Sequence, residues 1–383
     1  MSDGVITPEG HDGMGVISQT GDVVTLCRNH EIYGSKSFGP ADLTYDPKAG
    51  GGCANLQFDV RKGEWLKSWT SLAGTVQNCA GGPTPWGSWL SCEETVLGPH
   101  ESFRDVQYEH EKHHGWVFEV PAEGKASLEP LQALGRFVHE ALAIDPHDGI
   151  IYETEDRDTA GFYRFLPNEP EVLSKGGRLQ MLKVKGQSDL RTGAQRGVRY
   201  EAEWVDIEDP VRRHTPGTND GLGVYSQGKE KGATTFGRLE GCWFGDGVVY
   251  FNCTDGGEAK LGQIWSFSPQ DQILRLVFQS PSHDILDSPD NLTVSPRGGL
   301  VLCEDADLKP LRLHTLSRKG LLQTLAINNI QLRKGEHPRL TGDFSGGEWA
   351  GACFSPDGEW LFVNIQDPGV TFAITGPWSE LGV

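Results

Sequence analysis

The sequence is poor in positive charge and lacks the short motifs of several common enzyme classes. It contains 34 lysines and arginines against 53 aspartates and glutamates, which gives a formal net charge of −19. Because a phosphate backbone is bound mainly through lysine and arginine, this balance argues against a nucleic-acid partner. No G-x-S-x-G, Walker A, G-x-G-x-x-G or H-E-x-x-H motif occurs. These absences argue against a serine hydrolase, a nucleotide-binding protein or a zincin. They favour an enzyme in which metal ions supply the chemistry.

Long apolar runs and paired cysteines are also missing. No stretch approaches the length of a membrane span, so we expect no membrane partner. The first residues, MSDGVITPEG, have neither the basic start nor the apolar core of an export signal. The 8 cysteines include no C-x-x-C pair, which argues against a structural zinc site. Six of them stand in strand-like runs, where a free cysteine serves as a small apolar residue.

Glycine is abundant, with 50 residues, and 22 prolines accompany it, as in chains built from many short strands and tight turns. Six apolar runs end in acidic or amide residues. These runs are VVTLCRNHE to Glu31, SWLSCEE to Glu93 and Glu94, IIYETED to Glu155 and Asp156, VVYFNCTD to Asp255, LVLCED to Glu304 and Asp305, and LFVNIQD to Gln366 and Asp367.

Each run follows another strand-like segment across a turn, and a third apolar strand often comes after it, as in GWVFEVP and GFYRFLP. Such repeats predict an all-β, six-bladed β-propeller that forms a single domain over residues 1–383. Residues 169–238 are polar and interrupt the spacing, so we expect an insertion between the third and fourth repeats. A large β-sandwich is the competing fold, but it does not explain the repeated acidic ends.

A second set of acids stands at or just before the first strand of each repeat: Asp12, Glu140, Glu240, Asp290 and Glu348. The innermost strands of a propeller line its central channel, so we expect both sets to converge on one axis. Without cations the carboxylates would repel one another, and some would stay protonated. Hard oxygen ligands favour calcium, magnesium, manganese or ferric iron. Asp255 and Asp367 are expected only to end their strands.

Three further groups have both a functional and a structural interpretation. Cys79 is expected in a loop, as a metal ligand or nucleophile, or else packed against Trp86 or Trp89. Arg238 shares a strand face with Glu240 and forms either an oxyanion site or an ion pair. The DSPDN segment, with Asp287, Asp290 and Asn291, is either a calcium site or an Asx-turn.

Two adjacent pairs are expected to divide their roles. Glu93 and Glu94 point to opposite faces if both lie on a strand, so one of them is a metal ligand. In FVHEALAI we favour Glu140 as a ligand and His139 as a structural residue.

Long segments resemble the PhoX-type alkaline phosphatases over nearly the whole chain. They are NCAGGPTPWGSWLSCEET, GRFVHEALAIDP with YETED and FYRFLP, RLEGCW, DSPDNLTVSPRGGLVLCED and GEWAGACFSPDGEWLFVNIQDPGVTFAITGPW. The resemblance implies a six-bladed propeller whose mouth holds Fe3+ and Ca2+ and hydrolyses small phosphomonoesters. It implies an iron-binding role for Cys79 and a phosphate-binding role for Arg238. The matching positions are Glu31, Cys79, Glu93, Glu94, Glu140, Arg238, Glu240, Glu304, Asp305 and Glu348.

These considerations define the expected site. We expect Arg238, Cys79 and Glu240 to be catalytic. The expected metal ligands are Glu31, Cys79, Glu93, Glu94, Glu140, Glu155, Asp156, Glu240, Asp290, Glu304, Asp305 and Glu348. Alternative functions are a calcium-dependent lactonase or phosphotriesterase, and a non-catalytic calcium-binding propeller.

The start of the chain differs from the family pattern. Members usually carry a twin-arginine export signal and a further segment before an HDGM-like motif, whereas here only ten residues precede His11. We therefore expect a periplasmic or secreted monomer, with the signal and that first segment missing from this chain.

Overall fold

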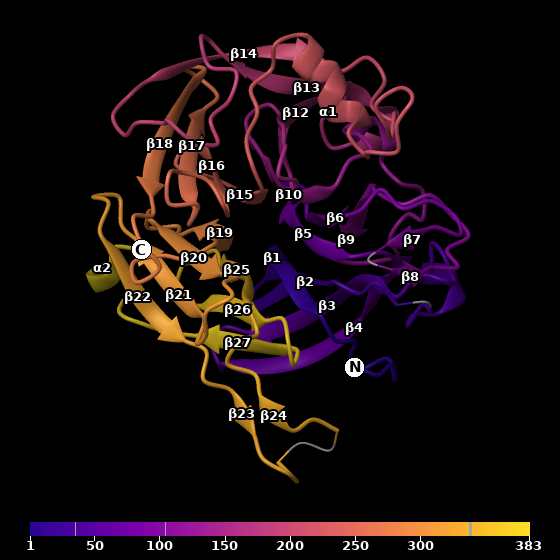
Figure 1. Cartoon of the computed structure of the whole chain (residues 1–383). Helices are drawn as coiled ribbons and strands as arrows, with labels where there is room; N and C mark the ends of the chain where they lie inside the picture. Colours follow the sequence, from indigo (N-terminus) through magenta and orange to yellow (C-terminus); the bar gives the residue numbers. More distant parts are fainter. Residues whose placement is uncertain (35, 104, 337–338) are drawn as a thin grey trace.

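The computed structural model describes residues 1–34, 36–103, 105–336 and 339–383. Nearly all of its regular structure is β-strand, and Figure 1 shows the strands as sheets arranged around a centre. The expectation of an all-β, propeller-like fold is confirmed. The described part contains two short α-helices, Gly223–Glu230 (α1) and Trp378–Leu381 (α2). Neither is long and apolar enough to cross a membrane.

Four sheets are small and follow the chain in order. Their strands run consecutively from the centre outward, so each sheet forms one blade. The first blade comprises His11–Thr20 (β1), Val23–His30 (β2), Gly51–Asp59 (β3) and Glu64–Thr75 (β4). The second comprises Asn78–Pro83 (β5), Ser88–Glu93 (β6) and Val117–Pro121 (β9). The fifth comprises Pro289–Val294 (β19), Leu300–Glu304 (β20), Arg312–Leu316 (β21) and Leu322–Ile327 (β22). The sixth comprises Trp349–Phe354 (β25), Leu361–Ile365 (β26) and Val370–Ile374 (β27).

The third and fourth blades are joined through their outer edges in one nine-stranded sheet. The third contributes His139–Ile144 (β10), Ile151–Glu155 (β11), Phe162–Pro167 (β12), Gly177–Val184 (β13) and Tyr200–Asp206 (β14). The fourth contributes Leu239–Gly245 (β15), Val248–Cys253 (β16), Gln263–Ser268 (β17) and Ile273–Gln279 (β18). β14 pairs with β18 and makes the junction. Residues 169–238 therefore extend the third blade with β13 and β14 and also carry α1.

The ring closes through the innermost strands, each of which contacts the next: β1, β5, β10, β15, β19 and β25, with β25 returning to β1. Two small hairpins lie between blade elements. They are Ser102–Phe103 (β7) with Val106–Gln107 (β8), and Gln331–Leu332 (β23) with Gly342–Asp343 (β24). Figure 1 shows the second hairpin projecting from the sheets.

One backbone irregularity recurs in all six blades. The first residue of the innermost strand pairs with the last residue of the second strand. The register shifts just after this pair or, in the sixth blade, after the next pair, Ala350 with Asn364. The residue after each second strand then donates its N–H, at 2.9 to 3.1 Å, to the carbonyl that precedes the innermost strand. A bulge of this kind turns side chains away from the regular alternation. It directs them to the same end of the ring in every blade.

Polar side chains of the second strands fix these bulges from the neighbouring blade. Asn29 donates to the carbonyl oxygens of Cys79 and Ala80 at 3.2 and 2.7 Å. Asn252, Asn364 and Thr154 make equivalent bonds to Asp290, Asp12 and Glu240, at 2.7, 2.5 and 2.6 Å. Because buried carbonyl groups need donors, these bonds allow the irregular segments to lie inside the protein.

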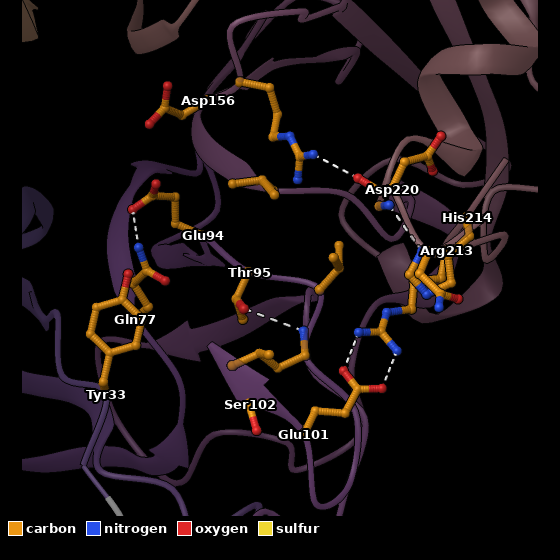
Figure 2. A pocket seen from close by; sticks show the side chains of 16 residues that line it. Tyr33, Gln77, Glu94, Thr95, Glu101, Ser102, Asp156, Arg213, His214 and Asp220 are labelled. Atoms are coloured by element: carbon orange, nitrogen blue, oxygen red, sulfur yellow. Dashed lines mark hydrogen bonds and ion pairs between the residues drawn. The ribbon is translucent and has the colours of Figure 1, made fainter. Parts of the chain in front are cut away.

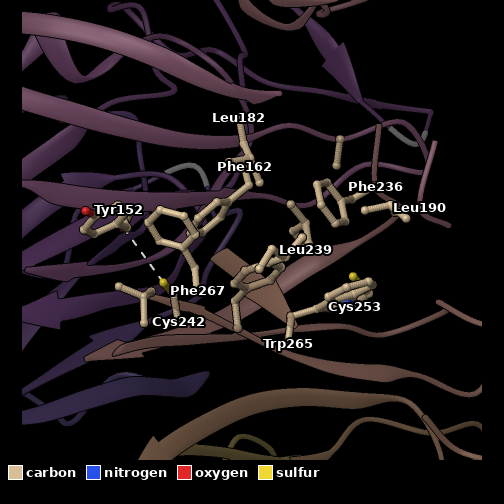
Figure 3. Packing of buried hydrophobic residues seen from close by; sticks show 14 of the residues in the cluster. Tyr152, Phe162, Leu182, Leu190, Phe236, Leu239, Cys242, Cys253, Trp265 and Phe267 are labelled. Carbon is tan, nitrogen blue, oxygen red and sulfur yellow. Dashed lines mark hydrogen bonds between the residues drawn. The ribbon is translucent and has the colours of Figure 1, made fainter. Parts of the chain in front are cut away.

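Apolar side chains fill the space between blades. Between the third and fourth, Phe162 stacks on Phe251 with ring centroids 4.3 Å apart. Figure 3 shows Phe162, Trp265 and Phe267 together with Cys242 and Cys253 in this core. All eight cysteines are buried and free. Six of them lie within β2, β6, β15, β16, β20 and β25, as the sequence predicted for small apolar residues.

Candidate metal centre

Both predicted sets of acids meet at the same end of the ring. Glu31, Glu94 and Asp305 each follow a second strand, and Glu348 directly precedes β25. The second residue of an innermost strand supplies the others, namely Asp12, Cys79, Glu140, Glu240 and Asp290. We call these nine residues the acidic cluster.

The acidic cluster divides into four groups whose possible ligand atoms lie within 4.8 Å of one another. Neighbouring groups share Cys79, Glu140 or Asp290. The groups are Asp12–Glu31–Cys79, Cys79–Glu94–Glu140, Glu140–Glu240–Asp290 and Asp290–Asp305–Glu348. They form a continuous series from the first blade to the sixth.

Burial dominates the electrostatics of the acidic cluster. It raises the pKa of Glu94, Glu140, Glu240 and Glu348 well above the usual range, and the neighbouring carboxylates add to the effect. The pKa of Asp290 rises to about 7 for the same reasons. Oε2 of Glu140 is buried without a hydrogen-bond partner. Crowded carboxylates of this kind, one of them with an unpaired oxygen, fit hard cations, which would supply the missing positive charge.

Cys79 lies in β5 and is only 7% exposed, so the predicted loop position is wrong. Gly81 and Gly82, which suggested a loop, instead allow β5 to pack closely against neighbouring strands. A Cβ on Gly81, for example, would lie 2.0 Å from the Leu90 carbonyl oxygen. The Cys79 thiol donates to Glu140 Oε1 at 3.0 Å, and Asp12 Oδ2 lies 3.6 Å away. Burial and these carboxylates raise the pKa of Cys79 well above its usual value. A thiolate at this position therefore requires a cation beside it.

Arg238 lies beside the acidic cluster and forms the predicted ion pair, while its role as an oxyanion site stays a prediction. Its Nε donates to Asp156 Oδ1 at 3.0 Å, and its Nη2 donates to Glu240 Oε1 at 2.8 Å. Burial would lower the pKa of Arg238, but Glu240 and Asp156 outweigh burial and raise it. The side chain is still 35% exposed. Arg238 is thus an ion-paired guanidinium whose charge is stabilised by its partners, with part of its surface open.

Four predicted ligands lie outside the four groups: Asp156, which pairs with Arg238, and Glu93, Glu155 and Glu304. Glu93, Glu155 and Glu304 are each the last residue of a second strand, and each precedes a residue that faces the ring axis. Because successive side chains on a strand point to opposite faces, these three acids point into the blades.

Each of the three has partners within its blade. Glu93 accepts from His114 Nδ1 at 2.6 Å. Glu155 accepts from the Tyr163 hydroxyl at 2.8 Å. Glu304 bonds to Arg312 and to His314 Nε2 at 2.8 and 2.9 Å. Their ligand roles stay predictions that the geometry does not favour.

The DSPDN segment is also divided. Asp290 belongs to the acidic cluster, whereas Asp287 accepts from His283 Nδ1 at 2.7 Å. Asn291 follows Asp290 in β19 and its side chain therefore points to the opposite face, so the three-residue calcium site stays a prediction that this geometry does not favour. His139 lies in the interior with Nε2 3.1 Å from the Gly135 carbonyl, as expected of a structural histidine.

Two amide side chains contact the acidic cluster and were not predicted as site residues. Gln77 donates to Glu94 Oε2 at 2.6 Å. Gln366 donates to Asp12 Oδ2 at 3.1 Å and also to Glu31. The sequence carried a signal for Gln366, because it occupies the position after a second strand that holds an acid in other blades.

A cavity of about 760 Å³ opens beside the acidic cluster. Figure 2 shows Glu94 and Asp156 on one side of it and Arg213, His214 and Asp220 on the other. The far side comes from residues 211–221, a part of the predicted insertion. The acidic cluster is therefore reached through a space large enough for a small organic molecule.

Comparison with protein families identifies the relationship. A family model described as alkaline phosphatase PhoX matches residues 59–369. The chain belongs to the alkaline phosphatase PhoX family. This membership confirms the sequence resemblance and supports metal-dependent hydrolysis of phosphomonoesters. A comparison with curated proteins gives no match.

A solved PhoX structure shares the fold of this chain. The Pseudomonas fluorescens PhoX in complex with vanadate superimposes with a TM-score of 0.67 at 18% identity, covering 94% of this chain and 84% of that one. The WD40 propeller domain of Doa1 gives a TM-score of 0.47 at 11% identity, with 97% and 96% covered. A gluconolactonase from Xanthomonas campestris gives 0.39 at 14% identity, with 96% and 97% covered. The last two have no bearing on the function of this PhoX family member.

Proposed function

We propose that this chain hydrolyses phosphomonoesters at a centre of ferric iron and calcium held by the acidic cluster. The observation that carries the proposal is the series of four linked groups directly beside the guanidinium of Arg238. Eight carboxylates and one thiol make up this series, and Arg238 forms an ion pair with one of those carboxylates, Glu240. Membership of the PhoX family supports the same reaction.

The donor types suggest how the metals divide. The two groups that contain Cys79 would take iron, because a thiolate favours a transition metal. The remaining groups offer only carboxylate oxygens and would take calcium. When bound, such ions stabilise negative charge on phosphate oxygens and lower the pKa of water.

The protein side chains orient the ester. Glu240 and Asp156 hold the Arg238 guanidinium from two directions, which leaves Nη1 without a protein partner in the described part of the chain. That edge would donate to a phosphate oxygen, and the bond would strengthen as charge develops during transfer. Since Asp156 is the partner of Arg238, we give it this positioning role rather than a ligand role.

The decisive experiment joins metal analysis with an activity assay. The purified protein should contain iron together with several calcium ions and should hydrolyse p-nitrophenyl phosphate, with loss of activity when calcium is removed. Calcium without iron would point to a lactonase or phosphotriesterase, or to a non-catalytic propeller. Failure of the fully metallated protein to hydrolyse any monoester would refute the phosphatase assignment.

We further propose that the protein acts outside the cytoplasm, as a monomer. Calcium ligands in this number suit a calcium-rich compartment, and family members usually carry a twin-arginine signal. A twin-arginine segment encoded upstream of Met1 would support export, and light scattering would measure the mass. A cytoplasmic location of the native protein, or a stable dimer, would contradict this proposal.

A further inference from the structure

The cavity beside the acidic cluster has two unlike sides. Glu94 and Asp156 form the side next to the metal centre. Arg157, Arg213 and His214 form part of the rest. If the chain has the proposed phosphatase function, a phosphate held at the metal centre would direct its alcohol group into this cavity. The residues opposite the metal centre would then meet the alcohol part of the substrate.

Most charges around the cavity are already matched within the protein. Arg213 forms a bidentate ion pair with Glu101, as Figure 2 shows. The Asp220 carboxylate accepts from the backbone N–H groups of Thr215 and Leu222, at 3.0 and 2.9 Å. Burial would raise the pKa of Asp220, but these hydrogen bonds outweigh burial and lower it, so the group stays ionised.

Arg157 is different, because it has no carboxylate partner among the described residues. Its Nη2 donates to the carbonyl oxygen of Asp220 at 2.6 Å, which positions the side chain without neutralising it. The remaining donors of the guanidinium have no hydrogen-bond acceptor in the described structure. A guanidinium presents five N–H donors in a fixed plane, which suits an anion.

His214 adds an uncharged donor to the same wall. Its Nδ1 lies 2.9 Å from the Gly221 N–H and accepts from it, so in the neutral ring the proton is on Nε2. Burial and the nearby Arg213 lower the pKa of His214, which keeps the ring neutral. The cavity therefore offers one guanidinium without a carboxylate partner and one neutral N–H.

We propose that this cavity selects phosphomonoesters whose alcohol part carries a second negative charge, and that Arg157 is the specificity-determining residue. A carboxylate on the alcohol would accept from the free edge of the guanidinium. A volume of about 760 Å³ leaves room for a small hydroxylated acid. The preferred substrates are thus small phosphorylated carboxylic acids.

The test compares two esters of similar size, 3-phosphoglycerate and glycerol 3-phosphate. The unaltered protein should have a kcat/KM about 10-fold or more higher for 3-phosphoglycerate than for glycerol 3-phosphate. Only 3-phosphoglycerate has a carboxylate that can form a charged hydrogen bond with Arg157. Arg157→Gln should remove most of this preference by lowering kcat/KM for 3-phosphoglycerate. Its kcat/KM for glycerol 3-phosphate and its inhibition by inorganic phosphate should stay within about 3-fold, since neither ligand meets Arg157. Arg157→Lys, which keeps the charge, should restore part of the preference.

Arg191→Gln is the matched control, because Arg191 pairs with Asp189 at 2.6 Å and lies outside this cavity. It should leave both substrates unaffected. If the unaltered protein hydrolyses both esters equally, or if Arg157→Gln slows both alike, the selectivity proposal is overturned. If the metallated protein hydrolyses neither ester nor p-nitrophenyl phosphate, the phosphatase function itself fails. If an Arg157 variant does not fold, the comparison of the two esters in the unaltered protein still tests the proposal.

Discussion

Arg238 and Glu348 occupy equivalent positions in the fourth and sixth blades. Each directly precedes an innermost strand, and each carbonyl accepts the N–H of the residue after the second strand, Thr254 at 2.9 Å and Gln366 at 3.1 Å. The two blades therefore share the same backbone hydrogen bond at this position, but the side chain is positive in the fourth blade and acidic in the sixth. This reversal gives the acidic cluster one cationic side, which is where the proposed phosphate site lies.

Cys79 should be required for iron. Cys79→Ala removes the only sulfur donor of the four groups, so we expect loss of iron and of visible colour, with activity below about 1%. Absorption spectroscopy and metal analysis would check this outcome. Cys353→Ala is the control: Cys353 is fully buried in β25 and should lose only about 1–2 kcal/mol of stability. Retention of iron by Cys79→Ala would give Cys79 a purely structural role.

Replacement of Arg238 should weaken the binding of phosphate in both the ground state and the transition state. We expect Arg238→Lys to lower kcat/KM about 100-fold and to raise the inhibition constant of inorganic phosphate, because lysine lacks the planar pair of donors. Steady-state kinetics with p-nitrophenyl phosphate measure both quantities. Arg164→Lys, on the outer part of the third blade, should have neither effect. Unchanged phosphate inhibition in Arg238→Lys would reduce Arg238 to a structural ion pair.

Glu94 and Glu93 are adjacent in sequence and should behave in opposite ways. Glu94→Gln removes one of several buried, mutually repelling acids, so it should abolish activity but raise the melting temperature of the metal-free protein. Glu93→Gln breaks a buried ion pair with His114, and we expect a loss of about 3 kcal/mol. Thermal unfolding with and without chelator distinguishes the two. If the Glu93→Gln protein folds but loses metal, Glu93 is a metal ligand after all.

Metal removal should reverse the effect of pH on stability. In the metal-free protein, Asp290 has a pKa of about 7, above the usual aspartate value, and other cluster acids are raised in the same direction. The native state then binds protons that the unfolded chain does not bind, so the free energy of unfolding rises as pH falls from 8 to 6. The melting temperature in chelator should increase by at least about 2 °C over this range. In calcium the change should have the opposite sign, because protons compete with the metal.

Asn29 should contribute to stability without taking part in the chemistry. Asn29 is fully buried, and its side-chain oxygen accepts a hydrogen bond from Trp89 Nε1 at 3.0 Å. Its amide nitrogen donates to the carbonyl oxygen of Cys79, in the bulge of β5. Asn29→Ala leaves these groups unpaired, so a loss of about 2–3 kcal/mol is expected. Denaturant unfolding in excess calcium measures it, with the exposed Asn168→Ala as control. A loss below about 0.5 kcal/mol would show that water replaces the amide.

Local patterns predicted the strands of the propeller well and its outer parts poorly. The acidic ends of β6, β11 and β20 were visible because apolar runs stop there. By contrast, β13 and β14 lie within a polar segment, and their place is determined by pairing with β12 and β18. Such pairing between distant residues leaves no periodicity in the sequence.

The site was predicted as a set of residue types but not as a geometry. Sequence alone could not decide between Glu93 and Glu94, because the choice depends on where β6 stops and which face Glu94 then takes. Cys79 was placed in a loop because its glycine neighbours resemble turn residues, whereas their real role is close packing of strands. The wall with Arg157 and His214 depends on the path of residues 211–221, which no short motif specifies.

The sharing of Cys79, Glu140 and Asp290 between neighbouring groups has a thermodynamic consequence. A cation bound in one group holds in place a side chain that the next group also uses, so the first occupancy orders part of the next group. Loading should therefore be cooperative, with empty and full molecules predominating over partly filled ones. Since every group contains residues from at least two blades, this cooperativity would also link the rigidity of the whole ring to its metal content.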